Sequence, residues 1–341
     1  MDVRLPTVGA TSPAGGTAST AYGRRVKILV PDTVPLLDAL ATALPHDDLV
    51  AYPRKGPFPA GSEDAEVLVA WDLSHDLLAA APAALPALRL VQGLMAGPDR
   101  LLRTDFAPDV TIASGRGLHD GPVAEHALAL VLAAARRLDV CADAQRERRW
   151  AGELQREQTR PAGERFSTLD GAHVVVWGFG SIAQRLAPLL AALGARVTGV
   201  ASAAGERAGF PVVSDADLAD VLPTADVLLS VLPALESTRG ALDADVLAQL
   251  PRHAWFVNVG RGATVDEPAL QAALRDGRIA GAALDVVATE PLPADSPWWD
   301  TPNVILTPHV AGGRPQHADE LVVANVEALR TGEALRNVVD R

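Results

Sequence analysis

One segment, residues 173–200, constrains the fold of this chain more than any other. A valine-rich run, His173–Trp177, is typical of a buried strand, and Arg196–Val200 is typical of a second one. Between them lie Gly178, Gly180 and Ala183, followed by leucines at helical spacing. The first glycine permits a tight turn, the second lets the backbone approach a pyrophosphate, and the alanine lets helix and strand pack closely. Together these signals predict a βαβ unit that binds a dinucleotide.

The second strand lacks the acidic residue that usually binds an adenine ribose about 20 residues after the glycines. Ala201 and Ser202 occupy that place, and Arg207 follows. Ser202 and Arg207 could bind a ribose 2′-phosphate instead, which favours NADP over NAD. The alternative is that Arg207 is an ordinary charge on a solvated loop.

Further short strands alternate with helical segments along the whole chain, which is typical of an α/β protein with parallel sheets. A long alanine-rich helix is expected over Val123–Leu138, and a second alternating series runs from His173 to about Thr307. A last helix is expected near Gln316–Thr331. The strands expected before the long helix are Val26–Val30, Glu66–Ala70, Leu88–Gln92 and Val110–Ala113, with a helix near Pro35–Leu44.

Composition excludes several classes of protein. Hydrophobic residues make up 48% of the chain and charged residues 21%, so the chain is not disordered. A net charge of −12 argues against nucleic acid or anionic lipid as a partner. The only cysteine, Cys141, cannot form an intrachain disulfide. We find neither an apolar run long enough to span a membrane nor a secretory signal in residues 1–24, so we expect a cytoplasmic protein with a flexible N-terminal tail.

Three ionisable residues follow predicted strands in the second series: Arg261, Glu290 and His309. Because ligands of open parallel sheets bind beyond the carboxyl ends of the strands, one crevice could collect all three. Arginine can bind a carboxylate and polarise a carbonyl, and histidine can donate a proton near neutral pH. A carboxylate on the other imidazole nitrogen would fix the tautomer. These types suit reduction of a 2-keto acid beside a nicotinamide, with no metal ion.

At these residues the chain resembles the D-isomer-specific 2-hydroxyacid dehydrogenase family. The similar motifs, in family order, are Gly121–His126, Val174–Ile182, Asn258–Gly262, Leu284–Pro291 and Thr307–Gly312. The resemblance implies that Arg261 binds and polarises the substrate, Glu290 orients the imidazole, and His309 gives or takes the proton. It also implies hydride transfer between NAD(P)H and C2 of a small 2-keto or 2-hydroxy acid. Glyoxylate, hydroxypyruvate and pyruvate are expected candidates by size alone.

The resemblance also implies binding residues outside the three catalytic ones. A loop of Leu94, Met95, Ala96 and Gly97 is expected to bind the substrate carboxylate through backbone N–H groups, together with Arg261. The expected cofactor contacts are Gly178, Phe179, Gly180, Ser181, Ile182, Ser202, Arg207, Leu232, Pro233, Thr238, Val259, Gly260, Asp285 and Gly312.

The implied architecture is two doubly wound lobes, one Rossmann-like and one flavodoxin-like, with a cleft between them. The substrate lobe would be discontinuous and comprise residues 25–118 and 310–341. The cofactor lobe would comprise residues 119–309, and the resemblance further implies a homodimer.

Other functions remain open. The family includes transcriptional corepressors that sense dinucleotides, but these are expected to carry longer tails than the single helix that fits after His309. A phosphoglycerate dehydrogenase is possible, although there is no room for the regulatory domain that many of them carry. A formate dehydrogenase is disfavoured, because that branch pairs its histidine with glutamine and this chain has Glu290.

Overall fold

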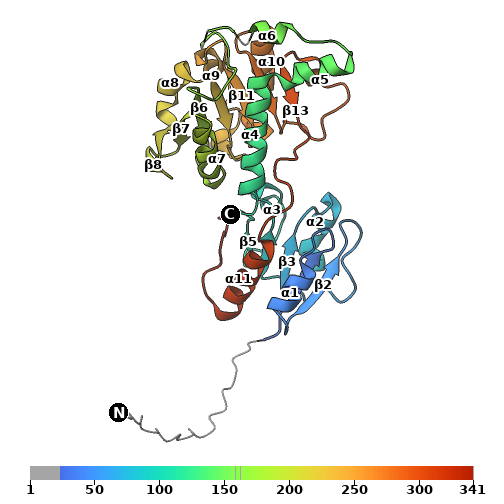
Figure 1. Ribbon diagram of the computed structural model, residues 1–341. Coiled ribbons are helices and arrows are strands. Elements are labelled where there is room, and N and C mark those ends of the chain that lie inside the picture. The colour runs from blue at the N-terminus through green and yellow to red at the C-terminus, as the bar shows by residue number, and fades with distance from the viewer. Residues whose placement is uncertain (1–23, 158, 162, 341) are drawn as a thin grey trace, which may run out of the picture.

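The computed structural model describes residues 24–157, 159–161 and 163–340, which form two α/β lobes (Figure 1). The first lobe contains a parallel sheet in the order β2-β1-β3-β4-β5. This order is that of flavodoxin-like sheets, in which the direction of winding reverses beside the first strand. The strands are β1 (Lys27–Pro31), β2 (Asp48–Tyr52), β3 (Val67–Ala70), β4 (Leu90–Gly93) and β5 (Thr111–Ala113).

Helices cover both faces of this first sheet. Successive strand residues point to opposite faces, so Ile28 packs with α1 and α11, whereas Leu29 packs with α2. Leu321 and Val322 of α11 thus lie in the same core as the N-terminal strand, and Figure 1 shows α11 beside α1. The helices of this lobe are α1 (Leu37–Ala43), α2 (His75–Ala84), α3 (Asp99–Leu102) and α11 (Ala318–Thr331).

The second lobe contains a larger sheet in the order β13-β12-β11-β10-β6-β7-β9-β8. All neighbouring strands are parallel except β8 and β9, and the order around β6 is that of a Rossmann sheet. Its strands are β6 (His173–Trp177), β7 (Arg196–Ala201), β8 (Gly205–Arg207), β9 (Phe210–Ser214), β10 (Val227–Ser230), β11 (Trp255–Asn258), β12 (Gly281–Leu284) and β13 (Val304–Leu306).

The long helix α4 (Asp120–Arg136) packs against this second sheet and against α7 (Ser181–Ala192). Small residues on its buried face, such as Ala124, Ala127 and Ala134, allow the close approach. The other helices are α5 (Leu138–Arg146), α6 (Glu153–Glu157), α8 (Leu218–Val221), α9 (Ala244–Gln249) and α10 (Glu267–Arg275). Short 3₁₀ turns lie at Asp215–Asp217, Leu222–Thr224, Glu236–Thr238, Gly262–Thr264 and Pro297–Asp300.

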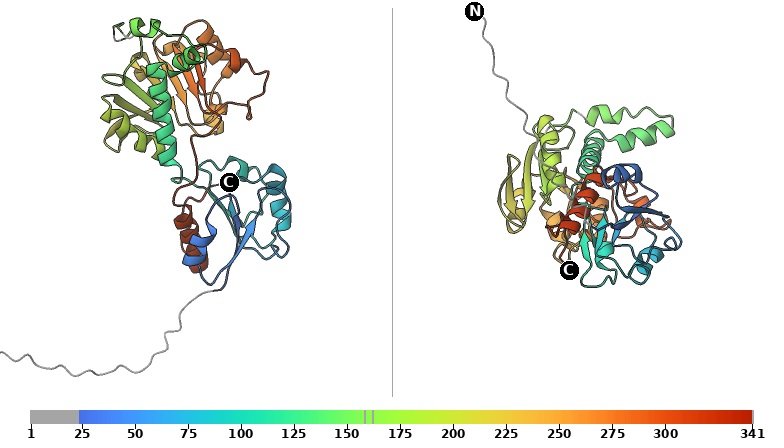
Figure 2. Two further views of the ribbon diagram at one scale, coloured as in Figure 1. Left: turned by 45° about the vertical axis from the view of Figure 1, so that its right-hand side comes forward. Right: turned by 90° about the horizontal axis from the view of Figure 1, so that it is seen from below.

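The chain crosses between the lobes twice, over residues 114–119 and 310–317, and both crossings lie at the waist seen in Figure 2. The crossings meet, because the backbone N–H of Gln316 donates to the carbonyl of Leu118 (2.8 Å). No helix in the described part of the chain is long and apolar enough to cross a membrane.

The predicted fold class, two parallel α/β lobes, is confirmed. The strand Asp48–Tyr52 was missed, because it is short and begins within a charged stretch, His46-Asp47-Asp48. The long helix ends at Arg136, two residues before the expected Leu138, because Arg137 adopts a left-handed conformation (φ 51°) and a new helix begins. The tail predicted over residues 1–24 lies outside the described residues except for Arg24.

Candidate active site

The glycine turn after β6 meets two other strand ends of the Rossmann sheet. Gly178 has φ 96°, and a Cβ there would lie 2.9 Å from the carbonyl of Val231. A Cβ on Gly260 would lie 2.6 Å from the carbonyl oxygen of Leu232. The turns after β6, β10 and β11 are therefore in backbone contact, at the point where the sheet reverses its winding. This is where open α/β sheets bind their ligands.

The start of α7 fits a dinucleotide pyrophosphate. Gly180 is the N-cap of α7, and a Cβ on it would meet nothing within 4 Å, so the space above it is open. The first-turn N–H groups, including those of Ser181 and Ile182, have no partners within the helix and favour an anion. Phe179 was also predicted to contact the cofactor. Its side chain is buried and its N–H donates to the carbonyl of Val200 (3.1 Å), so neither group is available for such a contact.

Arg207 lies over this glycine loop. From β8, its guanidinium donates to the carbonyl of Phe179 (3.1 Å) and to that of Ala203 (3.2 Å). Ser202 is exposed directly after β7, five residues before Arg207. A cation and a hydroxyl therefore stand where the adenine ribose of a dinucleotide is expected.

His309 and Glu290 form a hydrogen-bonded pair beyond the ends of β12 and β13. His309 Nδ1 lies 2.6 Å from Glu290 Oε2, and Glu290 Oε1 accepts from the backbone N–H of Val287 (3.1 Å). Burial raises the pKa of the Glu290 carboxyl, but the bonds from His309 and Val287 and the charge of Arg261 outweigh it, so this pKa lies below its usual value. An ionised Glu290 keeps a proton on Nδ1 and turns Nε2 outward for proton transfer.

Asp285, at the end of β12, holds the segment that carries His309. Its buried carboxylate accepts from Thr307 Oγ1 (2.6 Å) and from the backbone N–H groups of Val310 and Ala311 (3.0 Å each). His126 of α4 adds a contact, with Nε2 3.0 Å from Thr307 Oγ1. His309 itself has φ 52°, a conformation that non-glycine residues adopt rarely and that these bonds maintain.

Arg261 reaches from the Rossmann lobe to the first lobe. Its Nη1 donates to the carbonyl of Gly260 (2.7 Å), and its Nε lies 3.6 Å from Asp99 Oδ2 of α3. A Cβ on Gly97 would overlap Arg261 Nη2, so any other residue at this position would displace the guanidinium. The turn that carries Arg261 is held by Asn258, whose side chain bonds to Gly260 N (3.0 Å) and Arg261 O (3.2 Å).

The guanidinium of Arg261 lies against the loop that was predicted to bind a substrate carboxylate. Among the described residues, the backbone N–H groups of Met95, Ala96 and Gly97 have no acceptor. The N–H of Leu94 donates to the carbonyl of Ala70 (2.9 Å) as a continuation of the sheet. Leu94 is therefore not free to bind the substrate in this way, which corrects the expectation for that residue.

Of the remaining predicted cofactor residues, Leu232, Pro233 and Val259 lie in the turns after β10 and β11, whereas Gly312 lies in the second crossing between the lobes. Leu232 and Val259 are buried beside the glycine turn, and the carbonyl of Gly312 faces His119. The hydroxyl of Thr238 closes its own loop, by donating to the carbonyl of Pro233 (2.5 Å) and accepting from the N–H of Leu235 (2.9 Å). The roles of these residues and of Asp285 toward a cofactor remain predictions.

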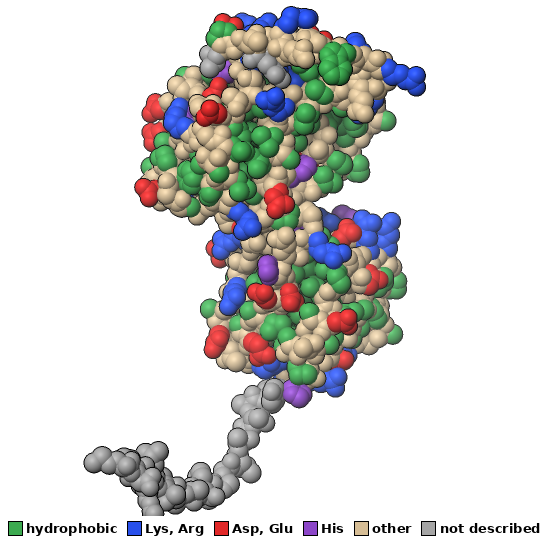
Figure 3. Space-filling model, in the orientation of Figure 1, with side chains coloured by type: hydrophobic (Ala, Val, Ile, Leu, Met, Phe, Trp, Pro, Cys, Tyr) green, Lys and Arg blue, Asp and Glu red, His purple; other side chains and the backbone are tan. Residues whose placement is uncertain are grey.

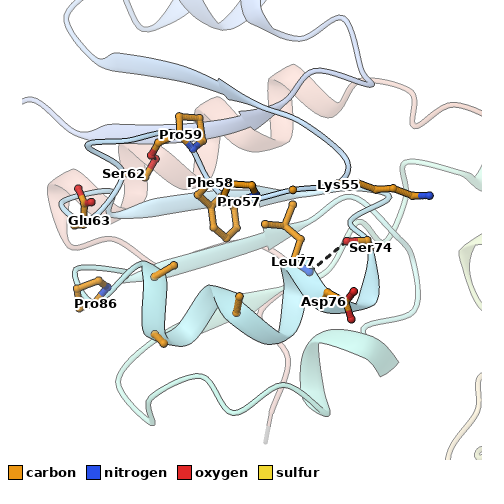
Figure 4. Close-up of a pocket in the computed structure, with 14 residues that line it drawn as sticks. Lys55, Pro57, Phe58, Pro59, Ser62, Glu63, Ser74, Asp76, Leu77 and Pro86 are labelled. Carbon is orange, nitrogen blue, oxygen red and sulfur yellow. Dashed lines mark hydrogen bonds between the residues drawn. The ribbon is translucent and has the colours of Figure 1, made fainter.

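A cavity of about 760 Å³ lies elsewhere, in the first lobe between α2 and the loop after β2 (Figure 4). Phe58 and Leu77 point into it, and Lys55 stands at its rim. None of the candidate catalytic or cofactor residues lines it. The site described above lies instead at the indented waist between the lobes, visible in Figure 3.

Sequence reasoning missed several residues of the site. His126 was quoted only as the last residue of the motif Gly121–His126, yet its ring lies 3.3 Å from Asp285 Oδ1. Asp99 and Thr307 carried no signal of their own, although Thr307 lies within a quoted motif and Asp99 lies two residues after the predicted substrate loop. His119 was used only as a lobe boundary, but its ring contacts the carbonyl of Leu94 before the 95–97 loop and the carbonyl of Gly312 in the second crossing.

Comparison with known proteins supports the interpretation of the site. Residues 128–311 match the family model described as "D-isomer specific 2-hydroxyacid dehydrogenase, NAD binding domain". Glyoxylate/hydroxypyruvate reductase A of Serratia proteamaculans (strain 568) is 31% identical over 324 residues, 89% of this chain and 94% of that protein. D-3-phosphoglycerate dehydrogenase of Mycobacterium tuberculosis is 31% identical over 98% of this chain, which covers 58% of that protein.

Solved structures are similar over nearly the whole chain. A D-isomer specific 2-hydroxyacid dehydrogenase from Xanthobacter autotrophicus Py2, in complex with NADPH and MES, is 33% identical with a TM-score of 0.75, covering 92% of this chain and 98% of that one. An NADPH-dependent glyoxylate/hydroxypyruvate reductase from Sinorhizobium meliloti, in complex with NADP and sulfate, is 27% identical with a TM-score of 0.76, covering 93% and 98%.

These matches confirm the predicted class, an NAD(P)-dependent oxidoreductase of 2-hydroxy acids. The family model covers more than half of the chain, and the Serratia relative aligns over most of both proteins. The chain belongs to the D-isomer specific 2-hydroxyacid dehydrogenase family.

Proposed function

We propose that this protein reduces a small 2-keto acid, of the size of glyoxylate or hydroxypyruvate, to the D-2-hydroxy acid and that it prefers NADPH. The observation that carries the proposal is the position of the Arg261 guanidinium against the loop with three free N–H groups, Met95 to Gly97. The reductases from Serratia and Sinorhizobium, named above, act on compounds of this size.

In this proposal the substrate carboxylate binds the N–H groups of Met95, Ala96 and Gly97. Arg261 supplies the positive charge, and its planar fork can contact both the carboxylate and the keto oxygen. Developing negative charge on that oxygen is stabilised by a guanidinium already held at Gly260. Arg261 therefore both binds the substrate and lowers the barrier.

His309 protonates the keto oxygen through Nε2. Glu290 stays ionised, holds the Nδ1 proton and stabilises the imidazolium before transfer. When bound along the start of α7, the nicotinamide dinucleotide supplies the hydride for C2. The buried Asp285 carboxylate keeps the His309 segment at a fixed distance from the substrate.

The preference for NADPH rests on Arg207 and Ser202. Arg207 lies on the glycine loop, and no acidic side chain directly follows β7 to bind a ribose 2′-hydroxyl. The relatives from Xanthobacter and Sinorhizobium were solved with NADPH and NADP, respectively. The expected result for Arg207→Gln is a loss of NADPH preference of about tenfold, from one lost phosphate contact.

Initial rates test the proposal directly. Glyoxylate, hydroxypyruvate, pyruvate and 3-phosphohydroxypyruvate are compared with NADPH and NADH in parallel. We expect the first two to be turned over fastest, NADPH to exceed NADH, and His309→Gln to abolish turnover while NADPH still binds. Preference for the phosphorylated acid would favour a phosphoglycerate dehydrogenase, the candidate supported by the relative from Mycobacterium tuberculosis. Near-normal turnover by His309→Gln would contradict the proton-donor role.

We also propose the chain division predicted above, with residues 25–118 and 310–341 in the substrate lobe and 119–309 in the cofactor lobe. The packing of α11 against β1 and of α4 against α7 supports it. A cytoplasmic location and a homodimer complete the proposal, and light scattering of the purified protein tests the latter.

A further inference from the structure

His119 lies where the two crossings between the lobes meet, immediately before α4. Its residue is 4% exposed, and both ring nitrogens contact carbonyl oxygens. Nε2 lies 2.7 Å from the carbonyl of Leu94, and Nδ1 lies 2.8 Å from the carbonyl of Gly312. The ring also stacks on Trp71, with centroids 5.5 Å apart and planes 13° apart. The imidazole is therefore held on three sides.

The two carbonyls belong to the two halves of the active site. Leu94 directly precedes the N–H groups of Met95 to Gly97, and Gly312 lies three residues after His309. Because a carbonyl oxygen only accepts, both contacts are hydrogen bonds only when each ring nitrogen carries a hydrogen. One side chain thus links the substrate loop of the first lobe to the segment of the proton donor.

We propose that His119 is a positioning residue that sets the distance between the substrate-carboxylate loop and His309. The inference rests on the proposed function, because it assigns the substrate carboxylate to that loop. His309 is fixed to its own lobe through Asp285, and the loop is fixed to the first sheet through Leu94 N. His119 bonds to both of these fixed segments, and we call it the joint between them. It therefore controls the distance between the keto oxygen and His309 Nε2.

Backbone contacts around the joint support a close fit. The N–H of Gly115 donates to the carbonyl of Met95 (2.7 Å), and a Cβ on Gly115 would overlap the carbonyl of Leu94. A Cβ on Gly312 would lie 3.5 Å from His119 Nδ1. The glycine at position 115 therefore lets the chain pass close to Leu94, whose carbonyl contacts His119, whereas a side chain at position 312 would make only an ordinary van der Waals contact with the imidazole.

Three variants separate the two links. His119→Asn keeps an N–H near the place of Nδ1 and so keeps the bond to Gly312, whereas His119→Gln keeps one near Nε2 and the bond to Leu94. His119→Phe keeps the stacking on Trp71 and donates neither bond. His75→Asn, at an exposed histidine of α2 in the first lobe, is the control.

We expect His119→Phe to lower kcat by about 100-fold, the loss associated with a misplacement of roughly 1 Å. The asparagine and glutamine variants should lie between it and the wild type, with the Kd for NADPH unchanged within twofold in all three. His75→Asn should behave as the wild type. Retention of kcat within threefold by His119→Phe would overturn the proposal, as would an equal loss of kcat and NADPH affinity.

NMR of ¹⁵N-labelled histidine rings gives a readout that does not need turnover. The signals lost in His119→Asn should show a hydrogen on both ring nitrogens, and a single protonated nitrogen would overturn the two-sided link. If the wild-type enzyme reduces none of the keto acids, the proposed function fails, whereas the ring signals still decide whether the joint exists.

Discussion

Replacing Asp285 with asparagine should disorder the segment that carries His309 without changing its chemistry. The carboxylate accepts three hydrogen bonds of 3.0 Å or less, two at Oδ1 and one at Oδ2. An asparagine whose oxygen takes the place of Oδ1 keeps the bonds from Thr307 and Val310. Its NH₂ group then faces the N–H of Ala311, so two donors meet in a buried position.

The expected losses of stability and of kcat follow from these contacts. A buried donor without an acceptor costs roughly 1–3 kcal/mol. The two remaining bonds change from charge-assisted to neutral and lose about half of their strength, or roughly 1 kcal/mol each. We therefore expect Asp285→Asn to lower the free energy of unfolding by about 3–5 kcal/mol, or to relieve that strain by moving the loop. A shift of roughly 1 Å would reduce kcat by about 100-fold.

Urea unfolding, keto-acid kinetics and NADPH titration measure the three consequences separately. Asp295→Asn, at an exposed carboxylate of a neighbouring loop, is the control and should change stability by no more than about 0.5 kcal/mol. The reasoning fails if Asp285→Asn matches this control in both stability and kcat. A weaker Kd for NADPH with unchanged kcat would instead support the predicted contact with the cofactor.

Three further predictions concern the substrate loop, the proton donor and a buried histidine. Gly97→Ala should raise the KM for the keto acid by about tenfold, roughly 1.4 kcal/mol, because its Cβ displaces Arg261, while the Kd for NADPH stays constant in a fluorescence titration. Glu290→Gln should lower kcat by about 100-fold in steady-state assays, the order of a general acid–base contribution, since an uncharged partner no longer stabilises protonated His309; an unchanged kcat would exclude that role. Burial and the charge of Arg196 hold the pKa of His173 below 6.5, so below this pH the unfolded chain binds a proton that the native protein does not. Unfolding free energy should therefore fall as the pH drops below about 6.5, and His173→Gln should flatten this dependence in urea titrations between pH 5 and 7.5.

The dinucleotide-binding segment was predicted from local signals, and the structure shows why these sufficed. The strand His173–Trp177 has the expected bounds, and α7 begins directly after Gly180. Valines, glycines and helical leucine spacing act within a few residues of one another. The strand Asp48–Tyr52 had no such pattern, since it is half-buried and depends on pairing with β1 for its formation.

The support of the catalytic residues was less accessible to sequence reasoning. Arg261, Glu290 and His309 were predicted together because each follows a strand in a parallel sheet. The contacts that orient them join residues far apart in the chain, such as His126 with Thr307 and His119 with Leu94. Chain spacing carries no information on such contacts unless the packing of α4 against the second sheet and the path of the two crossings are known.

The net charge of −12 illustrates how local geometry outweighs composition at this site. Substrate and cofactor are anions, so the chain as a whole repels them. At physiological salt, exposed charges are screened beyond about 8 Å, and a ligand therefore senses mainly the groups next to it. These are the guanidinium of Arg261 with the free N–H groups of the 95–97 loop, and the N-terminus of α7 beside Arg207. Asp99 lies beside Arg261 and partly offsets its positive charge. Binding of an anionic substrate therefore depends strongly on how this one guanidinium is oriented.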